Sequence, residues 1–381
     1  MHVNVDRKTL DDILYLQKKK GDLVMLEYMS ERVKDFDVAY FVNELAEASK
    51  KLGILEAKID SYQFNSILIP MLQRKEAISS MYIEGTQTTI TDVLKNEIDP
   101  KPKEDAIWCE VRNHKKALIW GAEYLHSGKF THSFMKELHK IMMKDIISQD
   151  IKQTLGKYKQ KDNQIKSSTG LVVYDPPKAS ETKKYMDELI NFMNNTEDGI
   201  NPLIKAAMIH SQFESIHPFS DGNGRIGRVL ISLYLYKARV INFPFFYLSE
   251  AINQDKSVYY QMLTDSRTNS LDDWIKYFLR KVSVQTTKHI GYIDDLNALY
   301  LKTKNAVKEC INSPKFDEII ECLFTRPILN ADILEDILVV SRGQAIRYLN
   351  VLEEKRILFG DDRKRGKTFF FGELLDLARR I

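Results

Sequence analysis

A run of twelve residues from His217 to Arg228 constrains the fold of this chain more than any other stretch. It reads His-Pro-Phe-Ser-Asp-Gly-Asn-Gly-Arg-Ile-Gly-Arg. Gly222 and Gly224 lack a Cβ atom, so the backbone can turn sharply there and bring its N–H groups close to an anion. A helical spacing of apolar residues follows, at Ile226, Val229, Leu230 and Leu233. The run therefore predicts a tight turn that opens a helix, with the positive end of the helix at the turn.

Three kinds of polar side chain in this run suit the handling of a polyphosphate. Asp221 is a hard oxygen ligand of the type that binds Mg²⁺. Arg225 and Arg228 lie three residues apart, so they share a helix face and can offer planar guanidinium groups to phosphate oxygens. His217 has the type of side chain that accepts a proton near neutral pH. A lone histidine or a glycine turn is often only structural, whereas the combination indicates a functional site.

The run resembles the signature of the Fic family (filamentation induced by cyclic AMP), H-P-F-x-[DE]-G-N-G-R-x-x-R, and matches every specified position. The resemblance implies that His217 deprotonates a hydroxyl group of a target protein, that Phe219 anchors the loop in the core and that Asp221 holds Mg²⁺. It also implies an anion hole lined by Gly222, Asn223 and Gly224, and distal phosphates of ATP held by Arg225 and Arg228. The products would be an AMP-modified protein and pyrophosphate.

A second motif, Ser80-Met81-Tyr82-Ile83-Glu84-Gly85, lies far upstream. Gly85 is suited to the C-cap of a helix, which would place Ser80 and Glu84 one turn apart on the same face. The motif resembles the Fic inhibitory motif, [ST]-x-x-x-E-[GN]. That resemblance implies that Glu84 pairs with Arg228 and keeps ATP from a productive pose. A solvated glutamate at a helix end is the alternative interpretation.

A β signal stands out between residues 165 and 174. Leu171-Val172-Val173-Tyr174 predicts a strand, Ser168-Thr169-Gly170 a turn, and Asp175-Pro176-Pro177 the end of the hairpin. In the Fic family, a hairpin followed by a proline pair forms a flap beside the active site. The flap holds the backbone of the target by strand addition, which tolerates many sequences. An ordinary surface hairpin is the alternative.

Two more residues are candidates for binding the nucleotide. Tyr259, on an expected helix, becomes by family resemblance a candidate for packing on adenine or ribose, and simple core packing is an equal alternative. Gln212, five residues before His217, is a candidate for reaching the nucleotide from the preceding helix, with the same two interpretations. His210 is interpreted as a packed neighbour of this helix, because no third ligand is spaced to form a metal site with it.

The C-terminal part has a pattern of its own. Apolar spacing predicts three helices near residues 316–323, 333–337 and 341–352, and two strands at 357–359 and 368–371. Three helices followed by a hairpin is a winged-helix order. The candidate recognition helix carries Arg342, Gln344, Arg347 and Tyr348, and the tip at 360–367 carries four cations. The segment suits the DNA backbone or a protein or dimer contact, and the weakly basic chain favours the protein contact.

The composition excludes other classes of protein. Charged residues make up 29% of the chain and nearly balance, with a formal net charge of +3, so charge alone indicates neither nucleic-acid nor membrane binding. Cys109, Cys310 and Cys322 have no spacing typical of a disulfide framework or a zinc site. No signal peptide is evident, and no apolar stretch approaches the roughly 20 residues that span a bilayer. We therefore expect a cytoplasmic protein without membrane contact.

The sequence predicts a mainly α protein with a Fic-type helical core, a short β-hairpin flap and a C-terminal winged-helix domain. The expected domains are an N-terminal helical region with the inhibitory helix (1–125), the catalytic core (126–283), a connecting helix (284–314) and the winged helix (315–381).

The predicted function is transfer of AMP from Mg-ATP to a Ser, Thr or Tyr hydroxyl of a target protein or of the chain itself, held in check by Glu84. The chain is also a candidate homodimer. One alternative is another Fic-fold reaction, such as phosphate or phosphocholine transfer or removal of AMP, although Arg228 argues against the kinase-like members. The other alternative is a transcriptional regulator whose winged helix binds DNA.

Overall fold

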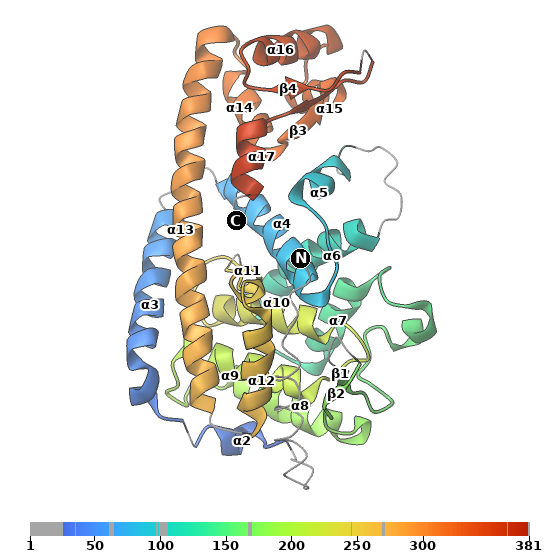
Figure 1. The fold of residues 1–381 in the computed structure, drawn as a ribbon, viewed down its shortest axis with the longest axis vertical. Helices are drawn as coiled ribbons and strands as arrows, with labels where there is room; N and C mark the ends of the chain where they lie inside the picture. Colours follow the sequence, from blue (N-terminus) through green and yellow to red (C-terminus); the bar gives the residue numbers. More distant parts are fainter. Residues whose placement is uncertain are drawn as a thin grey trace. The chain divides into compact units, whose positions relative to one another are not determined.

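The computed structural model describes residues 26–34, 36–60, 65–96, 98, 106–166, 170–244, 246–268, 271–363 and 365–379. The chain forms two compact units, each made of two stretches. Unit 1 comprises residues 1–50 and 116–283, and unit 2 comprises residues 51–115 and 284–381. Both are mainly helical, which confirms the predicted fold class (Figure 1).

Helix α9 (Pro202–Ile216) forms the centre of unit 1. Every residue from Leu203 to Ile216 is buried, so the helix is covered on all sides. The predicted helix start is confirmed, because Asn201 Oδ1 accepts a hydrogen bond from the Leu203 N–H at 2.9 Å and Pro202 occupies the first turn. Three helices pack against α9: α8 (Ala179–Asn194), α10 (Asn223–Lys237) and α12 (Lys256–Thr268) (Figure 1).

The other elements of unit 1 are also helical, apart from one hairpin. Trp274 Nε1 donates to the Ala207 carbonyl at 2.8 Å and so attaches α13 to α9. The hairpin joins β1 (Ile165–Lys166) to β2 (Val172–Tyr174) in an antiparallel pair. The remaining helices are α2 (Met29–Arg32), α7 (His132–Met143), the 3₁₀ helix η1 (Gln149–Thr154), α11 (Ser249–Asn253) and parts of α3 (Val38–Asp60), α6 (Ala106–Ser127) and α13 (Leu271–Cys310).

The hairpin is the one predicted from the sequence. Ile165 pairs with Tyr174, and Lys166 pairs with Val172. Gly170 has a φ of 82°, a left-handed conformation that suits glycine in a turn. Ser168 and Thr169, which we assigned to the turn, lie outside the described residues.

Unit 2 contains the helix with the upstream motif. This helix, α4 (Asn65–Glu84), contacts α5 (Ile90–Asn96) and α14 (Phe316–Thr325). Helix α17 (Gly372–Arg379) in turn contacts α5, where Arg379 Nη2 donates to Thr91 Oγ1 at 3.0 Å. Unit 2 therefore connects α4 and α5 to the C-terminal end of the chain.

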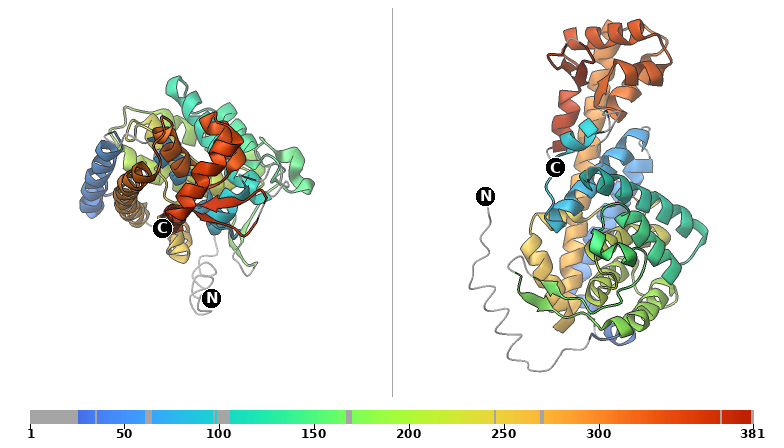
Figure 2. Two further views of the ribbon diagram at one scale, coloured as in Figure 1. Left: turned by 90° about the horizontal axis from the view of Figure 1, so that it is seen from above. Right: turned by 90° about the vertical axis from the view of Figure 1, so that its right-hand side faces the viewer.

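The last part of unit 2 is a small module of helices and strands, residues 316–379, which we call the C-terminal module (orange to red in Figure 2). Its sheet has the order β3-β5-β4 with antiparallel pairs, so that Phe370 lies between Ile328 and Phe359. The predicted order of three helices and a hairpin is present, and β3 and α17 are additions that the sequence did not predict. The elements are α14, β3 (Ile328–Asn330), α15 (Ala331–Leu338), α16 (Arg342–Glu354), β4 (Phe359–Gly360), β5 (Thr368–Phe370) and α17.

Among the helices of the described residues, none is long and apolar enough to cross a membrane.

Candidate active site

The backbone at His217 turns sharply away from α9. His217 is the C-cap of this helix, with φ 47° and ψ 59°, and its N–H donates to the Phe213 carbonyl at 3.0 Å. A left-handed conformation is costly for a residue other than glycine, so the surrounding structure has to hold it. The half-buried imidazole therefore begins a fixed loop of residues 217–222, which we call the signature loop.

Asn163 holds the signature loop by its amide group. Its Nδ2 atom donates to the carbonyl oxygens of His217, at 3.1 Å, and Phe219, at 3.0 Å. The amide oxygen accepts a hydrogen bond from Lys159 Nζ at 2.8 Å. One side chain thus fixes the two carbonyl groups that flank Pro218, and this role was not predicted from the sequence.

Lys159 supports the same loop from a buried position. Its N–H donates to the Pro218 carbonyl at 2.8 Å, and its Nζ donates to the Ile216 carbonyl at 3.1 Å. Burial lowers the pKa of Lys159 to about 8. Residues 159 and 163 therefore hold the first part of the signature loop, at His217, Pro218 and Phe219.

His139, on α7, fixes the other end of the signature loop. Its Nδ1 accepts a hydrogen bond from the Gly156 N–H at 3.0 Å, so its Nε2 carries the proton and donates to the Asp221 carbonyl at 3.1 Å. The ring stacks on Phe219, with centroids 4.1 Å apart. Burial lowers the pKa of His139 to about 4, so the imidazole stays neutral near pH 7. Phe219 itself is fully buried, as predicted.

The turn into α10 depends on Gly222 and Asn223. Gly222 is the N-cap of the helix with a φ of 79°, and an added Cβ atom would lie 2.4 Å from Met143 Sδ. Asn223 Oδ1 accepts from the Phe219 N–H, and Asn223 Nδ2 donates to the Phe219 carbonyl, both at 2.8 Å. Both polar atoms of the Asn223 side chain thus hold the loop, and the anion hole at Gly222, Asn223 and Gly224 stays a prediction. This end of α10 can bind an anion through the backbone N–H groups of its first turn, at Asn223 and Gly224.

Asp221 and the two arginines lie on this same end of α10. Asp221 Oδ1 accepts from the Gly222 N–H at 2.6 Å and lies 3.3 Å from Arg225 Nη2. The Asp221 side chain is 42% exposed, so a second face of the carboxylate reaches solvent. Arg228, one turn further along, is buried. Within the described residues there is no cluster of three or more His, Cys, Asp or Glu side chains for a metal ion, which leaves Asp221 as a single-carboxylate candidate.

The two further nucleotide candidates are buried. Tyr259 is 1% exposed, and its hydroxyl is 2.9 Å from His210 Nε2. Core packing is therefore the interpretation that the structure supports for Tyr259, while the adjacent Tyr260 is 43% exposed. Burial lowers the pKa of His210 to about 3, consistent with a packed neighbour.

The amide group of Gln212 is also occupied. Arg32 Nη1 donates to Gln212 Oε1 at 2.6 Å, and Gln212 Nε2 donates to the Glu27 carbonyl at 2.9 Å. Reaching a nucleotide would require Gln212 to give up both bonds, so its nucleotide contact stays a prediction. The signature residues come together in one loop and helix end, whereas Gln212 and Tyr259 belong to the packed interior.

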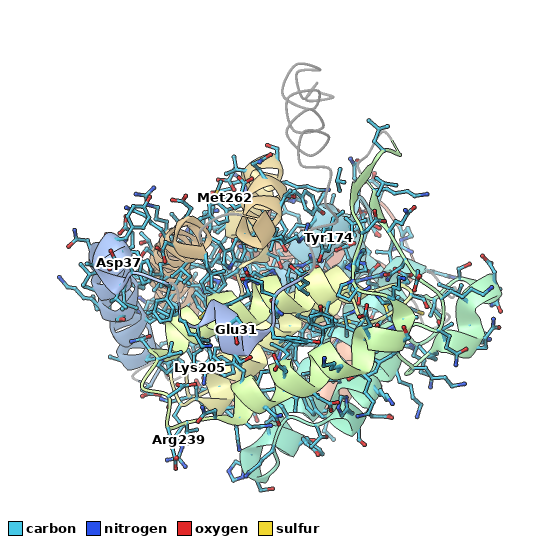
Figure 3. All side chains as sticks on the ribbon, turned by 90° about the horizontal axis from the view of Figure 1, so that it is seen from below. Glu31, Asp37, Tyr174, Lys205, Arg239 and Met262 are labelled. Atoms are coloured by element: carbon cyan, nitrogen blue, oxygen red, sulfur yellow. The ribbon has the colours of Figure 1, made fainter. Side chains whose placement is uncertain are left out.

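Arg267 connects the hairpin to the helix that carries His217. Its guanidinium lies 4.1 Å from the ring centre of Tyr174, a β2 residue labelled in Figure 3. Its Nε donates to Ser215 Oγ at 3.1 Å, two residues before His217. Burial lowers the pKa of Arg267 and raises that of Tyr174. No local motif marked Arg267 in the sequence, because its partners lie far away along the chain.

The upstream motif forms the end of α4, in unit 2. Glu84 is the last residue of the helix and is exposed, whereas Ser80 is buried. Gly85 has a φ of 95° and donates to the Tyr82 carbonyl at 3.1 Å. The Thr86 N–H donates to the Met81 carbonyl at 3.0 Å, which completes a Schellman cap. The predicted C-cap at Gly85 is confirmed, and the pairing of Glu84 with Arg228 stays a prediction.

Two protein-family models match this chain, and one of them covers the signature loop. The model of the Fic/DOC family matches residues 129–235, and that of the Fic/DOC family N-terminal region matches residues 42–123. This chain belongs to the Fic/DOC family. The first match contains the whole signature from His217 to Arg228, and the second contains the Ser80–Gly85 motif.

This Fic/DOC chain is similar at low sequence identity to proteins named as adenylyltransferases. A probable protein adenylyltransferase of Aquifex aeolicus (strain VF5) is 24% identical over 185 residues, 46% of this chain and 51% of that protein. A protein named protein adenylyltransferase Fic, of Nematostella vectensis, is 30% identical over 116 residues, 30% of this chain and 26% of that protein. The chain thus spans about half the length of the first relative and less of the second.

A solved structure supports the fold over most of this Fic/DOC chain. A Fic family protein from Desulfovibrio desulfuricans G20 has a TM-score of 0.57 at 20% sequence identity. The likeness covers 88% of this chain and 97% of that one. At this identity the comparison shows a shared fold.

Proposed function

We propose that this chain is a protein adenylyltransferase that moves AMP from Mg-ATP to a Ser, Thr or Tyr hydroxyl of a protein. The observation that carries the proposal is the signature loop. It places a histidine and a carboxylate next to the N-terminus of α10, the helix that carries the two arginines, and buried hydrogen bonds hold the loop. The relatives named as adenylyltransferases support the same chemistry.

His217 would act as the general base. A ring nitrogen of the imidazole would take the hydroxyl proton of the target, which raises the nucleophilicity of the oxygen that attacks the α-phosphate. The new bond joins this oxygen to the α-phosphorus, and pyrophosphate leaves with the electron pair of the broken bond. The fixed backbone at His217 supports the role, because a catalytic base has to be held at a set distance from the reacting group.

ATP and Mg²⁺ fit the donors on this end of α10. The first-turn N–H groups at Asn223 and Gly224 and the positive helix end suit phosphate oxygens, and Gly222 keeps the turn tight. Arg225 and Arg228 would hold the distal phosphates. Asp221 suits Mg²⁺, because this ion is commonly held by one or two carboxylates together with substrate phosphates. The bound ion would neutralise charge that develops on the phosphates.

The hairpin would hold the target protein. Strand addition to an exposed hairpin uses backbone hydrogen bonds, so it can present a hydroxyl to His217 from many different sequences. The bridge from Tyr174 through Arg267 to Ser215 supports this role, because it fixes the hairpin relative to the end of α9.

Glu84 would inhibit the resting enzyme. Arg228 keeps its charge at all physiological pH values and therefore requires an anion, which either the γ-phosphate or a carboxylate can supply. The capped end of α4 presents Glu84 as an exposed carboxylate, which supports the proposal. We expect Glu84→Gly to raise AMP transfer, and Arg228→Ala in the same chain to abolish the gain. Unchanged or lower transfer by correctly folded Glu84→Gly would contradict the inhibitory role.

The C-terminal module would contact protein rather than DNA, within this proposal. Several of its cations are already paired with carboxylates: Lys367 Nζ lies 2.7 Å from Glu353, and Arg363 Nε lies 2.7 Å from Asp361. Arg342, at the start of the candidate recognition helix, pairs with Asp332. Paired cations release fewer counterions on DNA, so we expect little salt-dependent DNA binding. A homodimer contact through this module remains part of the proposal.

Labelled ATP tests the proposed reaction. The full-length chain and its Glu84→Gly variant would be incubated with Mg²⁺ and ATP labelled at the α or the γ position, alone and with a protein extract. We expect protein-bound label from α-labelled ATP and none from γ-labelled ATP. The reverse pattern would favour phosphate transfer over AMP transfer.

A further inference from the structure

An excess of lysines surrounds the hairpin in unit 1. Residues 157–178 contain five lysines against two aspartates, an excess as large as the formal net charge of +3 of the whole chain. Lys159 is buried beneath the signature loop. The other four are exposed and form what we call the lysine surface: Lys157, Lys161, Lys166 and Lys178.

The two aspartates of this stretch have other partners. Asp162 Oδ1 accepts from the Ala179 N–H at the start of α8, at 2.8 Å, and its charge acts on the buried Lys159. Asp175 Oδ1 accepts from Gln164 Nε2 at 2.9 Å. Across the described part of the chain, no carboxylate forms an ion pair with any lysine of the lysine surface.

Some exposed lysines elsewhere in unit 1 have carboxylate partners. Lys183 Nζ lies 2.9 Å from Asp187 on α8, and Lys34 Nζ lies 2.8 Å from Glu31. Lys140 Nζ lies 3.2 Å from Glu137 on α7. The lysine surface therefore stands out by its number of cations within one short stretch of the chain.

The lysine surface lies beside the signature loop. Lys157 and Lys161 flank Lys159, whose N–H is bonded to the Pro218 carbonyl next to His217. The bond from Ala179 to Asp162 brings Lys178 close to Lys161, and Lys166 lies on β1 opposite Val172. A segment of another protein that pairs with the hairpin and reaches His217 would pass these lysines.

We propose that the lysine surface binds an acidic segment of the target protein, next to the hydroxyl that receives AMP. The inference rests on the proposed function and adds the chemistry of the partner. Strand addition gives affinity for many sequences, so charge outside the paired backbone is what would select among them. An exposed ion pair changes affinity by only about 1.5- to 5-fold. Three pairs of about 1.5- to 3-fold each would together favour an acidic target by about 3- to 30-fold.

Two synthetic peptides test the inference directly. Both have a single threonine, which is flanked by Asp and Glu in one peptide and by Asn and Gln in the other. Binding to the full-length His217→Ala chain is measured by fluorescence anisotropy over a range of salt concentrations. We expect about 3- to 30-fold tighter binding of the acidic peptide at low salt, and a smaller difference as salt screens the charges.

Charge reversal localises the effect. Lys161→Glu with Lys166→Glu should abolish the preference for the acidic peptide. The matched control, Lys50→Glu with Lys116→Glu, reverses two exposed lysines on α3 and α6 and should leave the preference intact. Circular dichroism and the affinity for ATP serve as checks that the fold and the nucleotide site are unchanged.

Equal binding of the two peptides, or equal effects of the two double variants, would overturn the inference. The inference would also be overturned if Lys161→Glu with Lys166→Glu weakened ATP binding but kept the preference for the acidic peptide. The lysines would then serve the nucleotide. The wild-type chain is also incubated with each peptide and α-labelled ATP. Binding with the expected charge dependence but no AMP transfer would count against the proposed function and leave the lysine surface as a site for acidic segments.

Discussion

The signature loop and the C-terminal module are held together by different forces. The loop is fixed by buried polar side chains: Asn163, Asn223 and His139 each satisfy backbone groups of residues 217–221. The module is fixed by an apolar core whose members are fully buried, among them Ile320, Leu323, Phe324, Leu334 and Leu349. Its charged residues lie on the outside, where several pair with each other.

Because of this difference, the loop network mainly fixes the position of the catalytic groups, whereas the module core mainly contributes to the stability of the fold. A satisfied polar network allows one geometry, because each donor and acceptor has a required direction and an unmatched buried group is costly. An apolar core contributes more to stability, but its packing is less directional. We therefore expect changes in the loop network to affect chemistry more than folding, and changes in the module core to do the reverse.

The largest expected effect on stability is in the module. Leu349→Ala removes a fully buried side chain on α16, which typically costs about 2–5 kcal/mol. Asn350→Ala, at the exposed neighbouring position, should be close to neutral. Urea unfolding monitored by circular dichroism would measure both, and AMP transfer by the folded fraction of Leu349→Ala should be normal. If Leu349→Ala lost AMP transfer without losing stability, the claim that the module core serves mainly stability would be wrong.

A pH-dependent effect should come from His139 in the loop network. Its pKa falls from 6.5 to about 4 on folding, so its contribution to stability is full above pH 6.5 and is lost as the pH falls toward 4. The total is about 3 kcal/mol. His139→Gln does not titrate, so its stability should fall less than that of the wild type between pH 7 and pH 4.5. Parallel pH profiles in urea unfolding would show that His139 is not held neutral.

The smallest effect on stability, with a large effect on chemistry, is expected at Asn163. Asn163→Ala removes the donor to the carbonyls of His217 and Phe219 and should cost about 1–3 kcal/mol. A displaced His217 should lower the rate of AMP transfer by about 100-fold. Gln160→Ala, an exposed residue of the same segment, is the matched control. If Asn163→Ala unfolds the chain more than Leu349→Ala does, the proposed division between placement and stability is wrong.

Local features of the fold could be predicted from the sequence. The turn at Gly222, the cap at Gly85 and the helix start at Asn201 all follow from the conformational preferences of one or two residues. The order of three helices and a hairpin in the C-terminal module also followed from local apolar spacing, whereas β3 and α17 did not. These features need no knowledge of distant contacts.

The side chains that hold the site could not be predicted in the same way. Lys159, Asn163, His139 and Arg267 act on residues that lie 52 to 82 positions away and belong to no local motif. Within the signature, the identity of Asn223 was evident but the direction of its side chain was not. Tyr259 and Tyr260 are neighbours of the same residue type, so the sequence does not show which of them is buried. The packing of their helix against the rest of unit 1 buries Tyr259.

The central claim is that the loop places His217 to take the proton of the attacking hydroxyl. Transfer of label from α-labelled ATP would be measured for wild type, His217→Ala and His126→Ala, the last a control at an exposed histidine on α6. We expect His217→Ala to lower the rate by about 10²–10⁴-fold while ATP binding and folding stay nearly unchanged. His126→Ala should behave as the wild type. Transfer by a folded His217→Ala chain at the wild-type rate would contradict the claim.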